Sequence, residues 1–451
     1  MSALHNLLGK RALQLLPEWE TAFWAEEMEN MPEYCFYPDH HLAAQWGDPE
    51  RFRSYEKYCV MPDGSCIPHG PVNTNGISMS LSGGIADSGL KDRVISYYLK
   101  TILKHLQNRD VTESARFAGT FAHFIQDSCI SVHVMDNLLI NSLFPPSEGK
   151  YHFYHRLVDN WHFEPDKIKE KPELLGRNIE EAAFIISEKI DQAVECGKKY
   201  MIPFLSAIRD GRKEEADRLS QLMNSNAVKF TADLWHTLFC IAFQKISPEE
   251  AEPLSLRFLT ESQMILSHDA MFDRNKFIQA GIPFYETVIP SSDPCRSRLS
   301  TDPYPYEPAV NIAYDGKGDL IPLALQIEKK TVQSDKGIAA GAYGIASYHV
   351  PGNLFSELEV YAGVHPASAS DQEITFAVWG YGLENPLMAF GKASRNTDAL
   401  HFIIPIPEIC HTISLLSAGG NRNTSAIWLN PVLKSRIDLQ FQHIFLPKNP
   451  V

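Results

Sequence analysis

Five histidine and aspartate side chains between residues 123 and 159 have a spacing that suits metal binding. His123 and Asp127 are four positions apart, and His155 and Asp159 repeat that spacing. Residues four apart on an α-helix lie on one face, so each pair can hold a cation. His133 follows His123 by ten positions, which turns it ~80° around a continuous helix, so we expect it to serve a neighbouring ion. Imidazole and carboxylate ligands suit zinc, and the pattern predicts a multi-metal site.

A single His-x3-Asp pair is weak evidence, because most such pairs are hydrogen-bonded or surface pairs. Five other histidines fit that interpretation: His40, His41, His105, His152 and His162. The combination of two pairs with His133 is what favours metal binding.

Helices must position these side chains. Residues 93–108 and 112–134 contain no proline and only one glycine, Gly119, and their apolar residues recur at helical spacing. Residues 178–196 carry an amphipathic stripe with Asn178 as a candidate N-cap. We expect a short helix over 151–161 and one or two helices over 213–243. Residues 31–90, rich in proline, glycine and asparagine, predict long loops.

From about residue 250 the pattern changes to short runs that alternate with period two. Ile374, Phe376 and Val378 fall on one face of such a run, and Leu439 and Phe441 on one face of another. Turn signals every ~8–12 residues predict a β-sandwich or jelly roll. The expected architecture is therefore multidomain: an all-α domain over residues 1–246 and an all-β jelly-roll sandwich over 252–451.

The composition of the 451 residues is that of a globular protein, with 44% hydrophobic residues and a net charge of −14. So acidic a chain is a poor default binder of nucleic acid or anionic membranes. No apolar run is long enough to predict a membrane span. Lys10 and Arg11 interrupt the first apolar stretch, so the chain is either cytosolic or a mature form whose export signal has been removed. Cys59 and Cys66 flank a turn, and both a local disulfide and unpaired thiols are compatible with their spacing.

The histidine and aspartate pattern resembles the zinc-dependent phospholipase C and single-strand nuclease superfamily, whose hallmark is His-x3-Asp-x5-His followed by His-x3-Asp or Glu. Tyr37-Pro38-Asp39 is similar to the family's Pro-Asp ligand loop, and Pro68-His69-Gly70 to its segment with a ligand histidine. His5 with the following Gly9-Lys10-Arg11 looks like the family's amino-terminal region. This stretch is also similar to the catalytic domain of glycosylphosphatidylinositol-specific phospholipase D.

The resemblance implies an all-helical fold over about residues 1–240 that binds three zinc ions. The first ion would be held by Asp39, His69, His123 and Asp127. The second would share Asp127 and add His5 with the terminal amine and carbonyl of Met1. The third would be held by His133, His155 and Asp159. The gap between His133 and His155 is longer than in compact members, and Met1 stands where the family's mature chain often begins with Trp.

The function implied is hydrolysis of a phosphodiester by water that zinc activates, with Asp39 as a ligand and the candidate general base. We expect a secreted or extracytoplasmic phospholipase C-like enzyme that acts on a phospholipid or glycosylated phospholipid. A single-strand nuclease or nucleotidase with the same zinc centre is an alternative, although no basic and aromatic cluster stands near 60–80 or 130–160. A non-catalytic glycan- or lipid-binding protein is a further alternative.

Residues 336–433 resemble a carbohydrate-binding-module-like jelly roll. The matching pieces include Lys336-Gly337-Ile338 and Ala426-Ile427-Trp428, while Gly380-Tyr381-Gly382 replaces the usual Asp-Gly turn. Trp379, Tyr381 and Trp428 are the candidates for stacking on a sugar, and a role in the core is the alternative for each.

Overall fold

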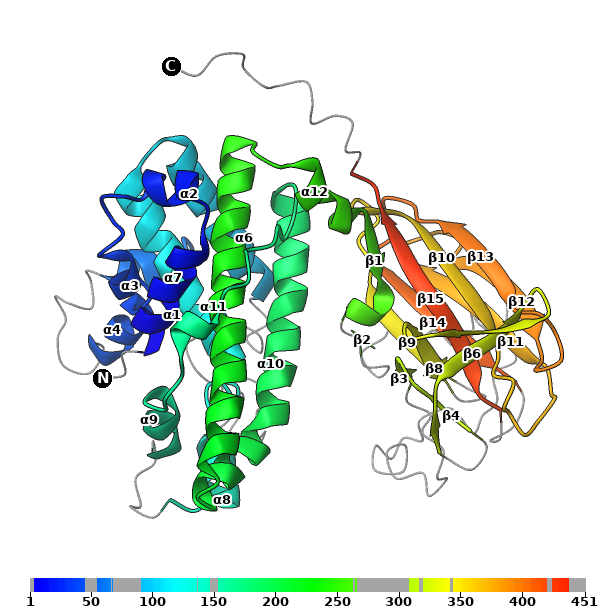
Figure 1. The fold of residues 1–451 in the computed structure, drawn as a ribbon. Coiled ribbons are helices and arrows are strands. Elements are labelled where there is room, and N and C mark those ends of the chain that lie inside the picture. The colour runs from blue at the N-terminus through cyan, green and yellow to red at the C-terminus, as the bar shows by residue number, and fades with distance from the viewer. Residues whose placement is uncertain are drawn as a thin grey trace. The chain divides into compact units, whose positions relative to one another are not determined.

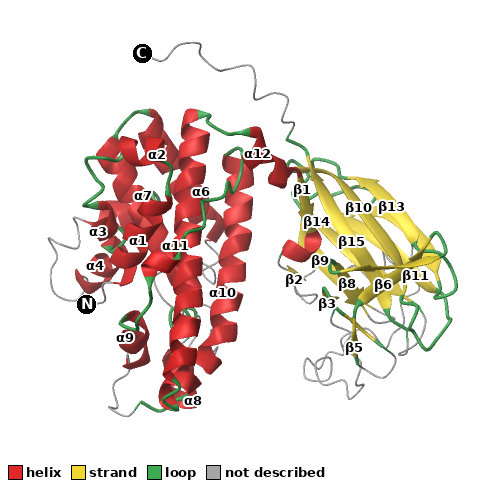
Figure 2. Ribbon diagram, in the orientation of Figure 1, coloured by secondary structure: helices red, strands yellow, loops and turns green. Residues whose placement is uncertain are grey.

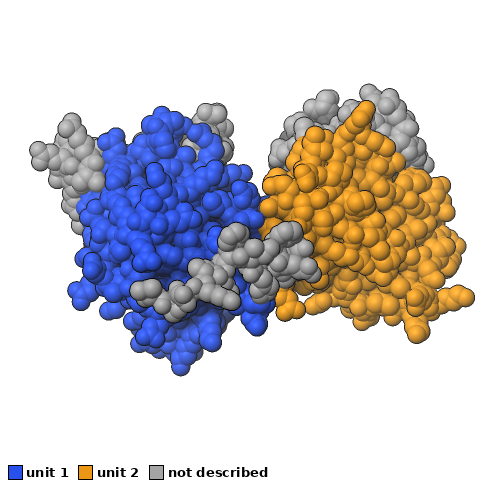
Figure 3. All heavy atoms as spheres, turned by 90° about the horizontal axis from the view of Figure 1, so that it is seen from above, with its two compact units in different colours: residues 1–251 blue, residues 252–451 orange. Residues whose placement is uncertain are grey.

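The computed structural model describes residues 4–44, 55–65, 67, 91–135, 137–146, 153–262, 264–265, 308–315, 319–340, 344–419 and 424–437. The chain divides into two compact units, Met1–Ala251 and Glu252–Val451 (Figure 3). Every α-helix of the described residues belongs to the first unit and every β-strand to the second (Figure 2). The predicted fold class, a helical N-terminal part followed by an all-β C-terminal part, is confirmed.

The first unit is built around two long neighbouring helices, α10 and α11 (Figure 1). Helix α11 also packs against α1, α6 and α7. The bounds are α1 Leu4–Leu15, α2 Glu18–Phe23, α3 Met31–Tyr34, α4 Tyr37–Ala44, α6 Lys91–Gln107, α7 Val111–Cys129, α8 Asn137–Leu143, α9 Phe153–Asp159, α10 Ile179–Arg209, α11 Lys213–Phe243 and α12 Pro248–Ala251.

Helix α7 is the central element of this unit. Its N-cap is Asp110, whose carboxylate accepts a hydrogen bond from the Glu113 N–H at 3.3 Å. From Phe117 to Cys129 every residue is buried. A helix enclosed on all sides can carry polar side chains into the interior only where other polar groups meet them. Asn178 caps α10 in the same way, as predicted, and accepts from the Glu181 N–H at 2.9 Å.

The helix bounds differ from the sequence expectation in three places. Helix α7 ends at Cys129 instead of continuing to residue 134, because Ile130 turns to an extended conformation. Helix α10 continues to Arg209, past the predicted stretch 178–196, whereas the single helix over 213–243 is one of the two expected alternatives. The segment expected as loops contains α3, α4 and a helical turn over 55–59 among its described residues. Short helices with proline at their first positions, as in α3, resemble loops in composition.

The second unit contains two antiparallel sheets. One has the strand order β13-β10-β15-β8-β3, with β1 paired to β15, and the other has the order β12-β11-β14-β9-β2. The strands of the first are β1 Leu256–Phe258, β3 Ala309–Val310, β8 Gly337–Ala340, β10 Phe355–Val364, β13 Leu400–Pro405 and β15 Ala426–Ser435. Those of the second are β2 Met264–Ile265, β9 Gly344–His349, β11 Ile374–Tyr381, β12 Leu387–Ala393 and β14 Thr412–Ala418. Two further hairpins are β4 Ala313–Tyr314 with β5 Leu320–Ile321, and β6 Leu323–Ile327 with β7 Lys330–Ser334.

The two sheets pack face to face around an aromatic core. Phe376 on β11 meets Trp428 on β15 edge-to-face, with ring centroids 5.4 Å apart, and both side chains are fully buried. Ile374 and Val378 are buried on the same face of β11 as Phe376. The alternating pattern of this strand therefore marks the inner face of a sandwich, as predicted. The predicted strand around Leu439 and Phe441 lies outside the described residues.

None of the described helices is both long and apolar enough to cross a lipid bilayer.

Candidate metal centre

Six imidazole and carboxylate side chains of the helical unit lie close together, and they come from α1, from α7 with the turn that follows it, and from α9. His5 comes from α1 and the pair His123 and Asp127 from α7. His133 lies in the turn after α7, and His155 and Asp159 are on α9. These six are all predicted metal ligands from the sequence, and Asp127 lies at the centre of the arrangement.

The first group consists of His5, His123 and Asp127. Within this group each carboxylate oxygen of Asp127 faces one of the two imidazoles: Oδ1 lies 3.4 Å from His5 Nε2, and Oδ2 lies 3.3 Å from His123 Nε2. The two rings are 4.1 Å apart between centroids. All three side chains are buried, and their candidate ligand atoms lie within 4.8 Å of one another. This donor set fits a cation of zinc's class.

The second group consists of His133, His155 and Asp159, and its ligand atoms meet the same 4.8 Å limit. Asp159 lies 3.1 Å from His133 Nε2 through Oδ1 and 3.1 Å from His155 Nδ1 through Oδ2. The other nitrogen of His133, Nδ1, lies 3.3 Å from Asp127 Oδ1. The imidazole of His133 therefore joins the two groups. Because α7 ends at Cys129, the angle expected for His133 on a continuous helix does not apply.

Two partners outside the groups fix the histidine tautomers. His5 Nδ1 lies 2.8 Å from Gln126 Oε1, and His123 Nδ1 lies 2.8 Å from the Cys35 carbonyl oxygen. Both oxygens can only accept, so each Nδ1 carries a proton, and Nε2 is the nitrogen of each ring that faces Asp127 and that a cation would take. A metal-binding histidine is commonly held in this way. Neither partner could be predicted from the sequence, because no motif spacing marks a glutamine or a backbone carbonyl.

Gly119 allows the Cys35 carbonyl to reach His123. A Cβ atom at this position would lie 2.5 Å from Tyr34 Cβ and 2.9 Å from the Tyr34 carbonyl carbon. The end of α3 therefore rests directly on the backbone of α7, one turn before His123. Gly119 is consequently a requirement of the site, although it binds nothing itself.

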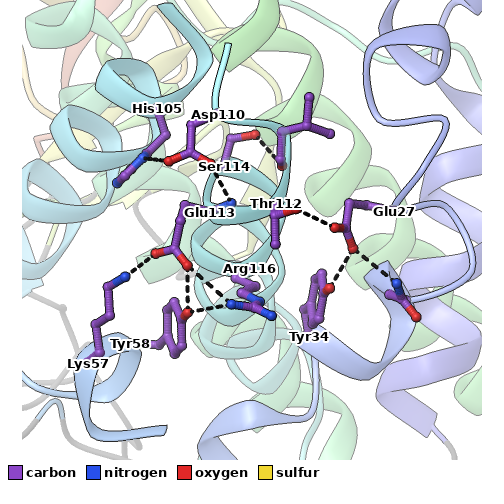
Figure 4. A network of polar contacts seen from close by, with 12 residues as sticks. Glu27, Tyr34, Lys57, Tyr58, His105, Asp110, Thr112, Glu113, Ser114 and Arg116 are labelled. Carbon is purple, nitrogen blue, oxygen red and sulfur yellow. Dashed lines mark hydrogen bonds and ion pairs between the residues drawn. The ribbon is translucent and has the colours of Figure 1, made fainter. Parts of the chain in front are cut away.

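A polar network around the first turns of α7 holds the neighbouring segments in place (Figure 4). Glu27 accepts hydrogen bonds from Tyr34 at 2.5 Å and from Thr112 at 2.6 Å. Glu113 accepts from Tyr58 at 2.9 Å and pairs with Lys57 and Arg116. These contacts tie α3 and the turn at 55–59 to α7, so that the Cys35 carbonyl and α4 have a fixed position.

Burial and neighbouring charges set the protonation of these side chains. Burial and the adjacent His123 lower the pKa of His5 to about 4, so this imidazole is neutral. Burial also opposes the charge of His133, but Asp127 and Asp159 outweigh it and raise the pKa of His133 to about 10. The pKa of His123 is raised by Asp127 against the same cost of burial. The pKa of Asp127 is well below its usual range because the surrounding imidazoles outweigh burial.

Asp39 lies in the first turn of α4 and is half-buried. Its negative charge favours the protonated form of all three imidazoles. It adds to the raised pKa of His123 and His133 and partly offsets the lowering of the pKa of His5, so it acts on both groups. The predicted ligands His69 and Met1 lie outside the described residues, as does Cys66, for which the sequence left both a disulfide with Cys59 and a free thiol open. His40 and His105, which we expected to be bystanders, pair with Glu33 at 2.6 Å and with Asp110 at 2.9 Å.

Binding of a cation at the second group must displace the proton of His133. Since its pKa is about 10, the imidazole is protonated from about pH 6 to about pH 8, and the affinity for zinc must rise with pH. Because one proton is displaced, the affinity for zinc should rise about tenfold per pH unit. Competition with a chromophoric chelator of known pH behaviour measures the slope. We expect a shallower slope for His133→Ala, and a pH-independent affinity of the unchanged protein would contradict the assignment.

The three aromatic candidates of the second unit have different surroundings. Trp428 is fully buried between the sheets, which leaves no ring face for a sugar. Trp379 is 4% exposed and packs in an apolar cluster with Ala377, Leu416 and Ala418. Tyr381 packs against the same cluster and keeps partial exposure. Of these three side chains, only Tyr381 offers surface to a ligand.

No protein-family model matches the chain, and neither does any curated protein. The similar solved structures include alpha-toxin from an avian strain of Clostridium perfringens, at a TM-score of 0.32 and 10% identity over 93% of this chain and 88% of that one. The CBM51-2 and INT domains of Clostridium perfringens ZmpB match with a TM-score of 0.24 and 16% identity over 28% of this chain. This chain therefore spans only about a quarter of the length of that protein, 27%. A CBM51 module from Clostridium perfringens GH95, in complex with methyl-galactose, matches with a TM-score of 0.24 and 21% identity over 28% of this chain and 87% of that one. These scores are too low to indicate a function for this chain.

Proposed function

We propose that this chain is a zinc-dependent phosphoric diester hydrolase of the phospholipase C type. One observation supports the proposal most directly. Two groups of imidazole and carboxylate side chains lie inside a helical unit, and the contact between His133 and Asp127 joins them into one continuous centre. Two cations held this close together suit a diester, because one phosphate group can contact both. Our proposal retains the three zinc ions with the ligand sets that the resemblance implies, in which His123 and His5 serve two different ions that share Asp127.

Each residue of the site has a distinct task in this proposal. The Nε2 atoms of His5 and His123 would each bind a cation, and Gln126 and the Cys35 carbonyl orient the two rings. Asp127 and Asp159 supply the negative charge that balances the cations. Zinc bound here would neutralise the charge of the phosphodiester and make water more acidic.

We assign the proton-accepting role to Asp39. Its side chain is half-buried, whereas Asp127 is buried and faces three imidazoles. A general base must reach both solvent and the reacting water, which a half-buried carboxylate at the edge of the centre can do.

The surroundings of the site favour a lipid over a nucleic acid. Tyr37, Tyr55 and Tyr58 pack together beside α4, with ring centroids 4.8 and 5.3 Å from that of Tyr37, and could in principle stack on bases. A single-strand nuclease would also need free cations along this surface. Lys57 and Arg116, which contact the rings of Tyr58 and Tyr34, both pair with Glu113 instead (Figure 4). We therefore propose a phospholipid or glycosylated phospholipid as substrate, with the chain acting outside the cytoplasm.

A comparison of substrates tests the function. We expect the zinc-loaded protein to release diacylglycerol from phosphatidylcholine or phosphatidylinositol vesicles faster than it cleaves single-stranded DNA. The activity should disappear in His123→Ala. Faster cleavage of DNA would favour the nuclease alternative, and release of phosphatidic acid would indicate phospholipase D-type cleavage. Absence of any hydrolysis in a protein that holds zinc would support a non-catalytic binding protein.

A further inference from the structure

A second buried cluster of metal-binding side chains lies elsewhere in the helical unit. It consists of Glu20 on α2 and of His236 and Cys240 on α11, with Glu250 on α12 beside them. Figure 1 shows α2 and α12 at one end of the unit and α9, which carries Asp159, towards the other. The cluster shares no residue with the candidate metal centre, and the proposed hydrolase mechanism does not use it.

The geometry suits a cation bound by three side chains. His236 Nδ1 lies 2.6 Å from Glu20 Oε1 and 3.8 Å from Cys240 Sγ, and all three ligand atoms lie within 4.8 Å of one another. With usual zinc bond lengths, a shared tetrahedral ion separates nitrogen and sulfur by about 3.6 Å and nitrogen and oxygen by about 3.3 Å. To share an ion, Glu20 Oε1 would have to move about 0.7 Å further from His236 Nδ1, and the Cys240 thiol would have to turn towards the ion. Since His236 and Cys240 are four apart on one helix, both already face α2.

Glu250 orients the imidazole for this role. Its Oε1 accepts a hydrogen bond from His236 Nε2 at 3.1 Å, and its Oε2 accepts from the Ser247 N–H at 3.0 Å. With one proton held at Nε2 by Glu250, Nδ1 is the nitrogen that can give up its proton and bind a cation on the side of Glu20. A carboxylate behind a histidine is the usual support of a metal ligand.

The cluster also holds a buried oxygen without a partner. Among the described residues, none forms a hydrogen bond with Glu20 Oε2, although the Glu20 side chain is fully buried. Burial raises the pKa of Glu20, and it raises that of the Cys240 thiol too. An unpartnered carboxylate oxygen in the interior is costly, and a cation would supply the missing contact.

We propose that Glu20, His236 and Cys240 bind a zinc-class divalent cation that fastens α2 to the end of α11. Binding displaces one proton from the Cys240 thiol and one from the imidazolium of His236, and both protons pass to solvent. The cation adds two positive charges as these two protons leave, so the net charge of the buried cluster stays the same. We assign the site a structural role, because its three ligands are buried and join two helices.

Cobalt(II) tests this proposal without any measurement of hydrolysis. A cysteine thiolate bound to Co²⁺ gives a sulfur-to-metal charge-transfer band in the near ultraviolet, and the predicted ligands of the candidate metal centre include no sulfur. We expect the band in the full-length protein. Cys240→Ser should lose the band and should bind about one equivalent of metal less than the unchanged protein. The band should persist in Cys129→Ala, which removes a buried thiol next to the metal centre.

The outcome is decisive in either direction. Loss of the band in Cys240→Ser, with helical content kept by circular dichroism, supports the site, and a weaker band in Glu20→Gln adds the carboxylate. A cobalt-loaded protein that lacks the band, or a Cys240→Ser variant that retains it, overturns the proposal. Either result leaves the proposed hydrolase intact, because His123→Ala and not Cys240→Ser tests that function.

Discussion

Asp127→Asn is expected to lower phosphodiester hydrolysis by about a thousandfold, which corresponds to about 4 kcal/mol of transition-state free energy. Asp127 contacts His5, His123 and His133, so the substitution removes charge from both groups at once. An amide is a poorer ligand than a carboxylate and can place its N–H₂ group against an imidazole nitrogen. Zinc content should therefore fall in parallel with the rate.

Asp92→Asn is the matched control, because this exposed aspartate lies on α6 and accepts a hydrogen bond only from Ser187 among the described contacts. Its rate and zinc content should equal those of the unchanged protein within experimental error. If Asp127→Asn keeps its rate within about tenfold, Asp127 is not the residue on which the centre depends.

Gly119→Ala is expected to damage the site without touching any ligand. The new methyl group would meet the backbone of Tyr34 and push the end of α3 away from α7. Overpacking of this kind costs about 1–3 kcal/mol of unfolding free energy, against a gain of at most about 1 kcal/mol in helix propensity. The Cys35 carbonyl would move with α3 and no longer hold His123 in place. Loss of such a supporting contact lowers metal affinity by about 10- to 100-fold.

Urea denaturation of the metal-free protein measures the first effect, and zinc competition on the folded variant measures the second. A stabilised variant with unchanged zinc affinity would show that helix propensity outweighs the close approach of α3. It would also mean that the orientation of His123 does not depend on the Cys35 carbonyl.

Local sequence patterns predicted the helices well because the site lies on long, strongly periodic elements. The spacing of His123 and Asp127 on α7, and of His155 and Asp159 on α9, survives in the structure because both pairs lie within one helix. The position of His133 could not follow from spacing, since it depends on where α7 ends. A single extended residue, Ile130, changes the direction of the chain, and no proline or glycine marks that point.

The supporting residues could not be predicted because they come from distant parts of the chain. Gln126 reaches His5 across 121 positions, and the Cys35 carbonyl reaches His123 across 88. The second cluster combines Glu20 with His236, 216 positions apart. In the second unit the strand pattern located β11, but whether an aromatic residue faces the core or a ligand depends on the other sheet. Trp428 is buried because Phe376 packs against it.

Removal and return of zinc tests the central claim most directly. The purified protein would be dialysed against a chelator until the zinc is gone, and its hydrolysis of phospholipid vesicles would then be followed as zinc is added back in steps. Our account predicts that hydrolysis disappears with the metal, returns as zinc binds, and does not return in His123→Ala. Full hydrolysis by the zinc-free protein, or equal recovery in His123→Ala, would contradict it.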